Sequence, residues 1–92
     1  MKVEHDTEHH RFVVDLNPYE AFLLYAPKGK TLDFYHIYVP EPHRNRGLAG
    51  KILMAAFEYA QKEGVSVIPT CPFIRDDFLP RFPQYQSLIA KK

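Results

Sequence analysis

Cysteine is almost absent from this chain: Cys71 is the only one among 92 residues. An internal disulfide is therefore excluded, which favours a reducing, cytoplasmic compartment. The sequence also lacks an apolar run long enough to span a membrane, and it does not begin with the charged and apolar pattern of a signal peptide. We therefore expect neither a membrane partner nor export.

A large excess of one charge is absent as well. Twelve basic and 11 acidic residues give a net charge of +1, so we expect no broad electrostatic surface for a nucleic-acid partner. With 46% hydrophobic and 25% charged residues, the composition is that of a globular protein. A chain of this length forms one small domain, which we expect to span residues 1–92.

Four β-prone runs, over residues 3–6, 11–16, 20–26 and 32–39, predict antiparallel strands. A turn over residues 27–30 joins the last two runs as a hairpin. Two prolines, at positions 40 and 42, then stop ladder pairing and lead into an extended connector.

Residues 47–63 follow with the apolar spacing of an amphipathic helix, which Gly64 ends, and residues 65–68 form one more strand. A crossover of this kind predicts parallel pairing of the flanking strands. The predicted fold class is therefore α+β, with a mostly antiparallel sheet and a parallel strand-helix-strand unit. Because Pro69 limits pairing, we expect the two parallel strands to splay and to open a slot between residues 38–39 and 70–71.

The junction between strand and helix has the sequence Arg44-Asn45-Arg46-Gly47-Leu48-Ala49. A helix N-terminus offers unpaired N–H groups and a partial positive charge, so this junction predicts an anion site to which the arginines add charge. A solvated loop is the alternative. A nucleotide-phosphate loop is excluded because its upstream glycine is missing and Ile52 replaces the Ser or Thr, and the dinucleotide fingerprint is absent.

The junction R-N-R-G-L-A resembles the R/Q-x-x-G-x-G/A signature of the GNAT superfamily of acyl-CoA-dependent N-acetyltransferases. The chain is most similar to the minimal, YjdJ-type GNAT domain, through four segments in order: residues 36–40, 46–49, 69–73 and 82–85. The resemblance covers nearly the whole chain.

The resemblance implies that acetyl-CoA is the cosubstrate, with its pantetheine along the splayed strand and its pyrophosphate on the loop and helix N-terminus. Carried over to this sequence, the cofactor-binding residues are Tyr38, Val39, Arg44, Asn45, Arg46, Gly47, Leu48, Ala49, Gly50 and Lys51. The thioester would then reach toward Cys71.

Cys71 and His36 are the candidate catalytic residues. Cys71 precedes Pro72, which suits the first position of a short helix running to about Leu79, where a helix N-terminus would favour a thiolate acting as base or as nucleophile. We expect His36 to share a strand face with Phe34 and Tyr38, and imidazole suits proton transfer. The resemblance favours direct transfer over an acetyl-cysteine intermediate, and packing roles remain the alternative for both residues.

Tyr85 is a third candidate acid, and we expect Pro80 and Pro83 to break any helix in the last dozen residues. The residues His5, Glu8, His9 and His10 sit in a turn without metal-site spacing, so we predict no metal.

Two functions remain open. The first is an enzyme that transfers acetyl to an amine acceptor, either a protein or peptide lysine or a small amine. The alternative is a catalytically weak acyl-CoA-binding module that needs a partner. The sequence leaves monomer and dimer open.

Overall fold

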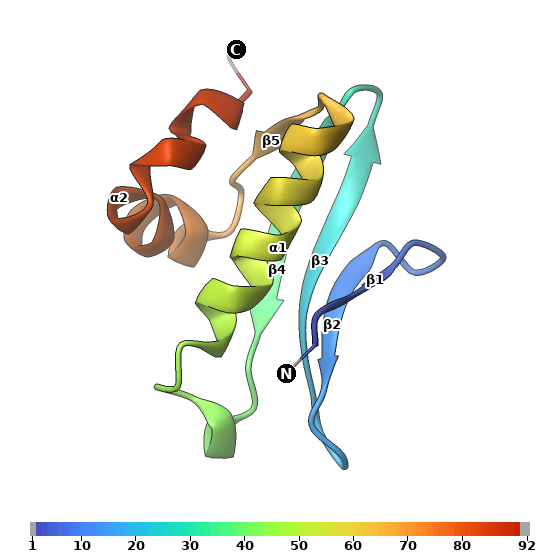
Figure 1. The fold of residues 1–92 in the computed structure, drawn as a ribbon, viewed down its shortest axis with the longest axis vertical. Coiled ribbons are helices and arrows are strands. Elements are labelled where there is room, and N and C mark those ends of the chain that lie inside the picture. The colour runs from blue at the N-terminus through green and yellow to red at the C-terminus, as the bar shows by residue number, and fades with distance from the viewer. Residues whose placement is uncertain (1, 91–92) are drawn as a thin grey trace.

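The computed structural model describes residues 2–90 and contains a five-stranded sheet with helices on one face (Figure 1). The strands lie side by side in sequence order, with these bounds: β1 (Glu4–Asp6), β2 (Arg11–Asp15), β3 (Glu20–Lys28), β4 (Thr31–Tyr38) and β5 (Ser66–Ile68). All neighbouring pairs are antiparallel except β4 and β5, which are parallel. The predicted α+β class and its parallel unit are confirmed.

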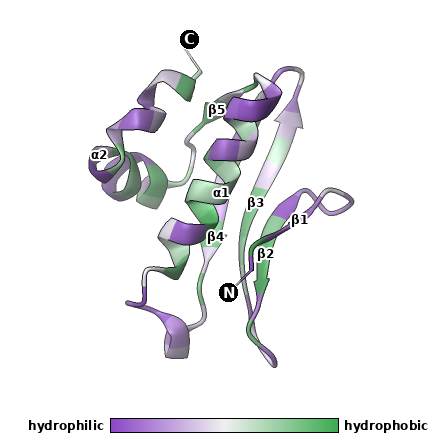
Figure 2. Ribbon diagram, viewed as in Figure 1, coloured by the Kyte–Doolittle hydropathy of each residue, from purple (hydrophilic) through white to green (hydrophobic). Residues whose placement is uncertain are grey.

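Helix α1 (Leu48–Glu63) carries the chain from β4 to β5. It lies between two glycines with left-handed backbone, Gly47 (φ 71°) and Gly64 (φ 69°), a conformation that glycine adopts without strain. Its polar positions colour the outward turns in Figure 2, while its buried residues pack on the sheet: Leu48, Ile52, Leu53, Ala56, Phe57 and Ala60. Within residues 2–90, no helix is long and apolar enough to cross a membrane.

After β5 the chain is helical over residues 72–81, which we call the second helical segment. It contains a π turn, η2 (Ile74–Phe78), and ends in α2 (Leu79–Arg81). The prediction that Pro80 breaks the helix is wrong, because the wider turn precedes this residue, which lacks an N–H, and the helix continues through it. Pro83, by contrast, does begin a new element, the 3-10 helix η3 (Pro83–Leu88).

The C-terminal part of the chain packs on α1 through aromatic rings. Phe57 of α1 stacks on Phe78 at 5.6 Å and on Tyr85 at 5.1 Å between ring centroids. The chain then pairs with β5, where the N–H of Ala90 donates to the carbonyl of Val67 at 2.8 Å. These contacts hold the second helical segment and η3 against α1 and β5.

A β-bulge in β4 decides which side chains face the helices. Leu24 pairs with His36, but the next residue of β3, Tyr25, pairs with Phe34, so Tyr35 is an extra residue in β4. Because one extra residue reverses the alternation, Phe34 faces α1 whereas His36 lies on the opposite face, near Phe22 at 6.2 Å. The predicted shared face of Phe34 and His36 is therefore wrong.

Strands β4 and β5 pair over only three residues, Thr31–Asp33 with Ser66–Ile68. One further bond follows, from the N–H of Cys71 to the carbonyl of Phe34 at 3.1 Å. Strand β4 continues to Tyr38 on its other partner, β3. The splayed pair that the sequence predicts is thus present, and it opens beyond Phe34 and Cys71.

Candidate functional site

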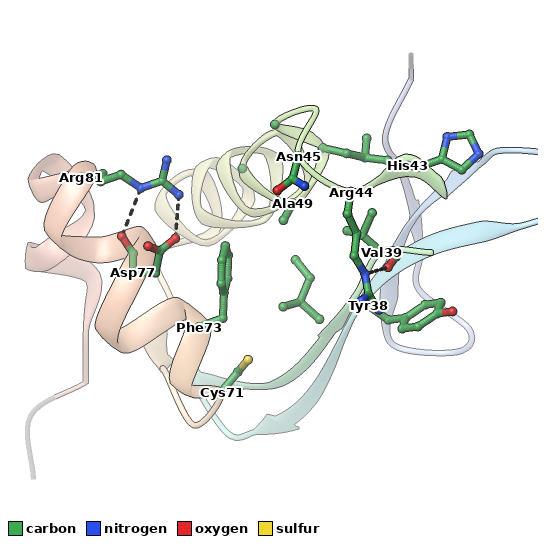
Figure 3. A pocket seen from close by; sticks show the side chains of 14 residues that line it. Tyr38, Val39, His43, Arg44, Asn45, Ala49, Cys71, Phe73, Asp77 and Arg81 are labelled. Atoms are coloured by element: carbon green, nitrogen blue, oxygen red, sulfur yellow. Dashed lines mark hydrogen bonds and ion pairs between the residues drawn. The ribbon is translucent and has the colours of Figure 1, made fainter. Parts of the chain in front are cut away.

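A cleft of about 640 Å³ lies where β4 and β5 part (Figure 3). Three parts of the chain line it: the end of β4, the loop with the first turn of α1, and the second helical segment together with Cys71. The lining residues are Ile37, Tyr38, Val39, His43, Arg44, Asn45, Gly47, Leu48, Ala49, Gly50, Cys71, Phe73, Asp77 and Arg81. Most of the predicted cofactor-binding residues are therefore in one cavity.

The loop before α1 leaves the helix N-terminus open toward the cleft. Asn45 (φ 67°) and Gly47 (φ 71°) both have left-handed backbone, and no side chain caps the helix. The bond from the N–H of Lys51 to the carbonyl of Gly47, 3.2 Å, is the first of the helix, so the N–H groups of residues 48–50 have no intrahelical acceptor. The first turn also carries no acidic residue. This arrangement suits a bound anion.

The basic residues of the junction have different positions. Arg44 donates from Nε to the carbonyl oxygen of Val39 at 2.8 Å, which holds its guanidinium at the cleft (Figure 3). Arg46 and Lys51 are exposed and lie outside the set of lining residues. Their contribution would be long-range charge rather than direct lining of the cleft.

The free edge of β4 presents backbone groups to the cleft. The N–H of Tyr25 in β3 donates to the carbonyl of His10, on the side of β2, so the backbone groups of Tyr25 point away from β4. Phe34 pairs with Tyr25 across the ladder, and its backbone groups therefore point away from β3, toward Cys71. After the bulge the same direction returns at Ile37. Val39 follows the end of β4, and its carbonyl accepts from Arg44. Sequence reasoning missed Ile37, since nothing in the sequence reveals the bulge.

Tyr38, between those two residues, has a different position. It lines the cleft, but the register directs its backbone groups to Phe22 of β3. Its ring also packs against Phe22, at 5.4 Å between centroids. Tyr38 therefore forms the border of the cleft, while Ile37 carries the free hydrogen-bonding edge.

Cys71 lies at the inner end of the cleft and is 8% exposed. Its carbonyl accepts from the N–H groups of Ile74 (3.0 Å) and Arg75 (3.2 Å), so it caps the second helical segment. The prediction that Cys71 immediately precedes a helix is confirmed. The thiol is free and buried beside the point where the two strands part.

The structure does not bring the other two candidate catalytic residues into the cleft. His36 is exposed on the opposite sheet face, as the bulge requires. Tyr85 is buried, and its hydroxyl donates to Glu58 Oε2 at 3.2 Å. Burial, with the Glu58 carboxylate nearby, raises the pKa of Tyr85. Both positions favour structural roles.

The wall formed by the second helical segment contains an ion pair that sequence reasoning missed. Arg81 donates from Nη2 to Asp77 Oδ2 at 2.8 Å and from Nε to the Asp77 carbonyl at 3.3 Å. The two residues are four apart, the spacing of a helical ion pair. The spacing did not reveal the pair in the sequence, because Pro80 predicts a helix break between the two residues.

Two histidines of the N-terminal turn and strand make hydrogen bonds with neighbouring side chains. His9 pairs with Asp6 at 2.9 Å, whereas His5 makes a 2.6 Å hydrogen bond with the hydroxyl of Tyr25. Among residues 2–90, no three His, Cys, Asp or Glu side chains gather as metal ligands.

Comparison with known proteins gives three results. A family model described as GCN5-related N-acetyl-transferase matches residues 11–88. Protein NATD1 of Bos taurus is 34% identical over 89 residues, covering 89% of this chain and 79% of the relative; Protein NATD1 of Homo sapiens is 33% identical with the same coverage. The solution NMR structure of a GCN5-like protein from Staphylococcus aureus superposes with a TM-score of 0.75 at 20% identity, covering 99% of this chain and 89% of that one.

Proposed function

The chain belongs to the GCN5-related N-acetyltransferase family, and on that premise we propose that it binds acetyl-CoA in the cleft and transfers the acetyl group to an amine. One observation carries the proposal. A single cleft brings together the free edge of β4, the open N-terminus of α1 and the thiol of Cys71. An elongated thioester with a pyrophosphate partway along it has the chemistry that matches these three parts.

The assignment of binding residues follows from this arrangement. The open N–H groups at the start of α1, with Arg44 beside them, suit the pyrophosphate. The backbone of Ile37 and the N–H of Val39 suit the amide groups of pantetheine, because a free strand edge pairs with extended amides, whereas the carbonyl of Val39 already accepts from Arg44. The proposed set is Ile37, Tyr38, Val39, Arg44, Asn45, Gly47, Leu48, Ala49 and Gly50, with Arg46 and Lys51 adding charge.

Gly50 gives this assignment independent support. It lies in the first turn of α1, where glycine is less favourable than alanine, and a Cβ built there has nothing within 4 Å. The fold itself therefore does not require glycine at this position. A close approach of the cosubstrate to the helix does explain it.

The proposed reaction is direct transfer. The neutral amine nitrogen attacks the thioester carbon, the C–N bond forms, the C–S bond breaks, and the proton lost by the amine ends on the departing sulfur. A backbone N–H at the β4 edge, on Ile37 or Val39, would stabilise the oxyanion. Cys71 would serve as the group that moves the proton, since it is the titratable side chain at the inner end of the cleft.

The subtype, the acceptor and the compartment form part of the same proposal. The four segments at residues 36–40, 46–49, 69–73 and 82–85 support a minimal domain of the YjdJ type. The acceptor class we propose is a protein or peptide lysine or a small amine, and the free thiol of Cys71 suits a reducing, cytoplasmic compartment. The second candidate function is an acyl-CoA-binding module that needs a partner, favoured because, of the three candidate catalytic residues, Cys71 alone lines the cleft.

Two measurements test the proposal. Calorimetric titration with acetyl-CoA should show one site per chain, with a chemical-shift footprint on residues 37–39 and 44–50. Thiol release from acetyl-CoA should then depend on added amine, tested with a lysine peptide, a polyamine and an amino acid. Binding without amine-dependent thiol release would support the binding module instead, and absence of binding would reject both.

A further inference from the structure

The Asp77–Arg81 pair offers a second cationic group to the cleft, on the wall opposite the α1 N-terminus (Figure 3). Both residues line the cavity, and they come from the helical segment that follows Cys71. The proposed pyrophosphate site already uses the α1 N-terminus and Arg44. Arg81 is therefore a cation that the proposed binding site has not yet used.

Only some of the hydrogen-bond donors of the Arg81 guanidinium are used within the protein. Its Nε and Nη2 atoms donate to Asp77, and both acceptors are on its own helix. A guanidinium has five N–H donors in a fixed plane, so donors remain for a planar or tetrahedral oxyanion. Phe82 lies 5.9 Å from the guanidinium carbon, which adds a second contact that orients the side chain.

The position of Arg81 indicates which anion it meets. Cys71, at the inner end, is buried, whereas the Arg81 side chain is 58% exposed, so Arg81 belongs to the mouth of the cleft. A thioester that reaches Cys71 with its pyrophosphate on α1 leaves its nucleoside end at the mouth. The remaining anionic group of coenzyme A is the 3′-phosphate on that ribose.

We propose that Arg81 binds the 3′-phosphate of the cosubstrate, and that Asp77 holds the guanidinium in position while weakening its field. The inference rests on the proposed function and deepens it, because it assigns the preference for coenzyme A over its dephosphorylated form. Arg81 is a specificity residue in this scheme, and Asp77 is a positioning residue.

The test compares the affinities of coenzyme A and 3′-dephospho-coenzyme A by calorimetry at low and high salt. The wild-type chain should prefer coenzyme A. Arg81→Gln should reduce that preference about five- to tenfold, the effect of losing one charged contact, while leaving the affinity for the dephospho form unchanged. Asp77→Asn keeps a hydrogen-bond acceptor but removes the opposing charge, so it should increase the preference, most clearly at low salt.

Arg75→Gln is the matched control. Arg75 pairs with Asp76 on the same segment but does not line the cleft, so its loss should leave both affinities unchanged. Equal losses for the two ligands in Arg81→Gln, an equal effect of Arg75→Gln, or a wild-type chain that does not discriminate would each overturn the inference. A wild-type chain that binds neither ligand would reject the proposed function itself, so the two failures are distinguishable.

Discussion

The N–H of Cys71 donates a 3.1 Å hydrogen bond to the carbonyl oxygen of Phe34, and this bond places the thiol where β4 and β5 part. Because the bond is made by the backbone, it fixes the position of residue 71 whatever its side chain. The side chain can therefore be changed without moving the strands. This separates the chemistry of the thiol from the geometry of the cleft.

Replacing Cys71 with alanine should lower turnover about 100-fold, the usual contribution of a proton-transferring side chain, while the affinity for acetyl-CoA stays within about twofold. Steady-state kinetics and calorimetry measure the two effects. Cys71→Ser is the matched variant, and it should recover part of the activity. Direct transfer predicts that the intact mass of the protein shows no acetyl adduct after incubation with acetyl-CoA alone. An adduct on Cys71 would establish the covalent route. Full activity of Cys71→Ala would mean that the cysteine has only a packing role.

Gly50→Ala should stabilise the fold and weaken the binding of acetyl-CoA. Alanine is more favourable than glycine in a helix by about 1 kcal/mol, and a Cβ at this position meets no atom within 4 Å. The same methyl group would occupy the surface that faces the pyrophosphate, for which we expect about a tenfold loss of affinity. Thermal unfolding and calorimetry measure these opposite effects.

Gly64→Ala is the control for that experiment. Gly64 has φ 69° at the other end of α1, so alanine there should destabilise the fold by about 1 kcal/mol. Its distance from the cleft predicts unchanged affinity for acetyl-CoA. If Gly50→Ala binds as well as the wild type, the cosubstrate does not approach this turn.

The bulge makes a clear prediction for His36. Since its side chain lies on the face of the sheet away from the cleft, His36→Gln should change turnover by no more than about twofold, as for an ordinary surface substitution. The comparison with Cys71→Ala under the same conditions is direct. A loss of turnover comparable to that of Cys71→Ala would instead show that His36 takes part in catalysis.

The strands and α1 were predictable because their patterns are local. Alternating apolar residues and a helical period each report on neighbours a few positions apart, and glycine marks the ends of α1. The loop with Gly47 before α1 could be predicted for the same reason. The position of Cys71 between a strand and a helix was also predictable, because Pro69 limits strand pairing before it and Pro72 suits the first position of the helix after it.

The errors arose where the structure depends on distant pairing. Nothing near Tyr35 indicates that Leu24 and Tyr25 pair with residues two apart, so the faces of His36 and Ile37 were not predictable. The same is true of the helix that continues through Pro80. Its cause is a π turn in the preceding residues, supported by aromatic packing on Phe57 that joins distant parts of the sequence.

His5 makes the stability of the fold depend on pH. The ring of His5 stacks on Phe12 at 4.1 Å, meets Tyr59 edge-on at 4.4 Å and bonds the Tyr25 hydroxyl. Burial lowers the pKa of His5 below 6.5; nearby His10 lowers it further, while the Asp6 carboxylate opposes both effects.

Because the unfolded chain takes up this proton more readily than the folded one, stability is complete above about pH 6.5 and falls as the pH drops through the folded pKa. Thermal unfolding from neutral to mildly acidic pH should show this loss, and His5→Gln should reduce it. His36→Gln, on an exposed position, should leave the pH dependence as in the wild type. An unchanged profile in His5→Gln would mean that other groups control the acid response.

Tyr85→Phe distinguishes a structural hydroxyl from a catalytic acid. The hydroxyl donates to Glu58 at 3.2 Å, so its loss should lower the free energy of unfolding by about 1 kcal/mol, the usual net value of one hydrogen bond. Glu58→Gln keeps an acceptor at that position, so it should cost less stability than Tyr85→Phe, and in the double variant it should add nothing, because the hydroxyl that it accepts from is gone. The ring still packs on Phe57 and Phe78 in every variant, and Tyr85 does not line the cleft, so turnover should stay within about twofold. A tenfold loss of turnover in Tyr85→Phe, with stability unchanged, would instead require this hydroxyl in proton transfer and a cleft that extends past Phe73 toward η3.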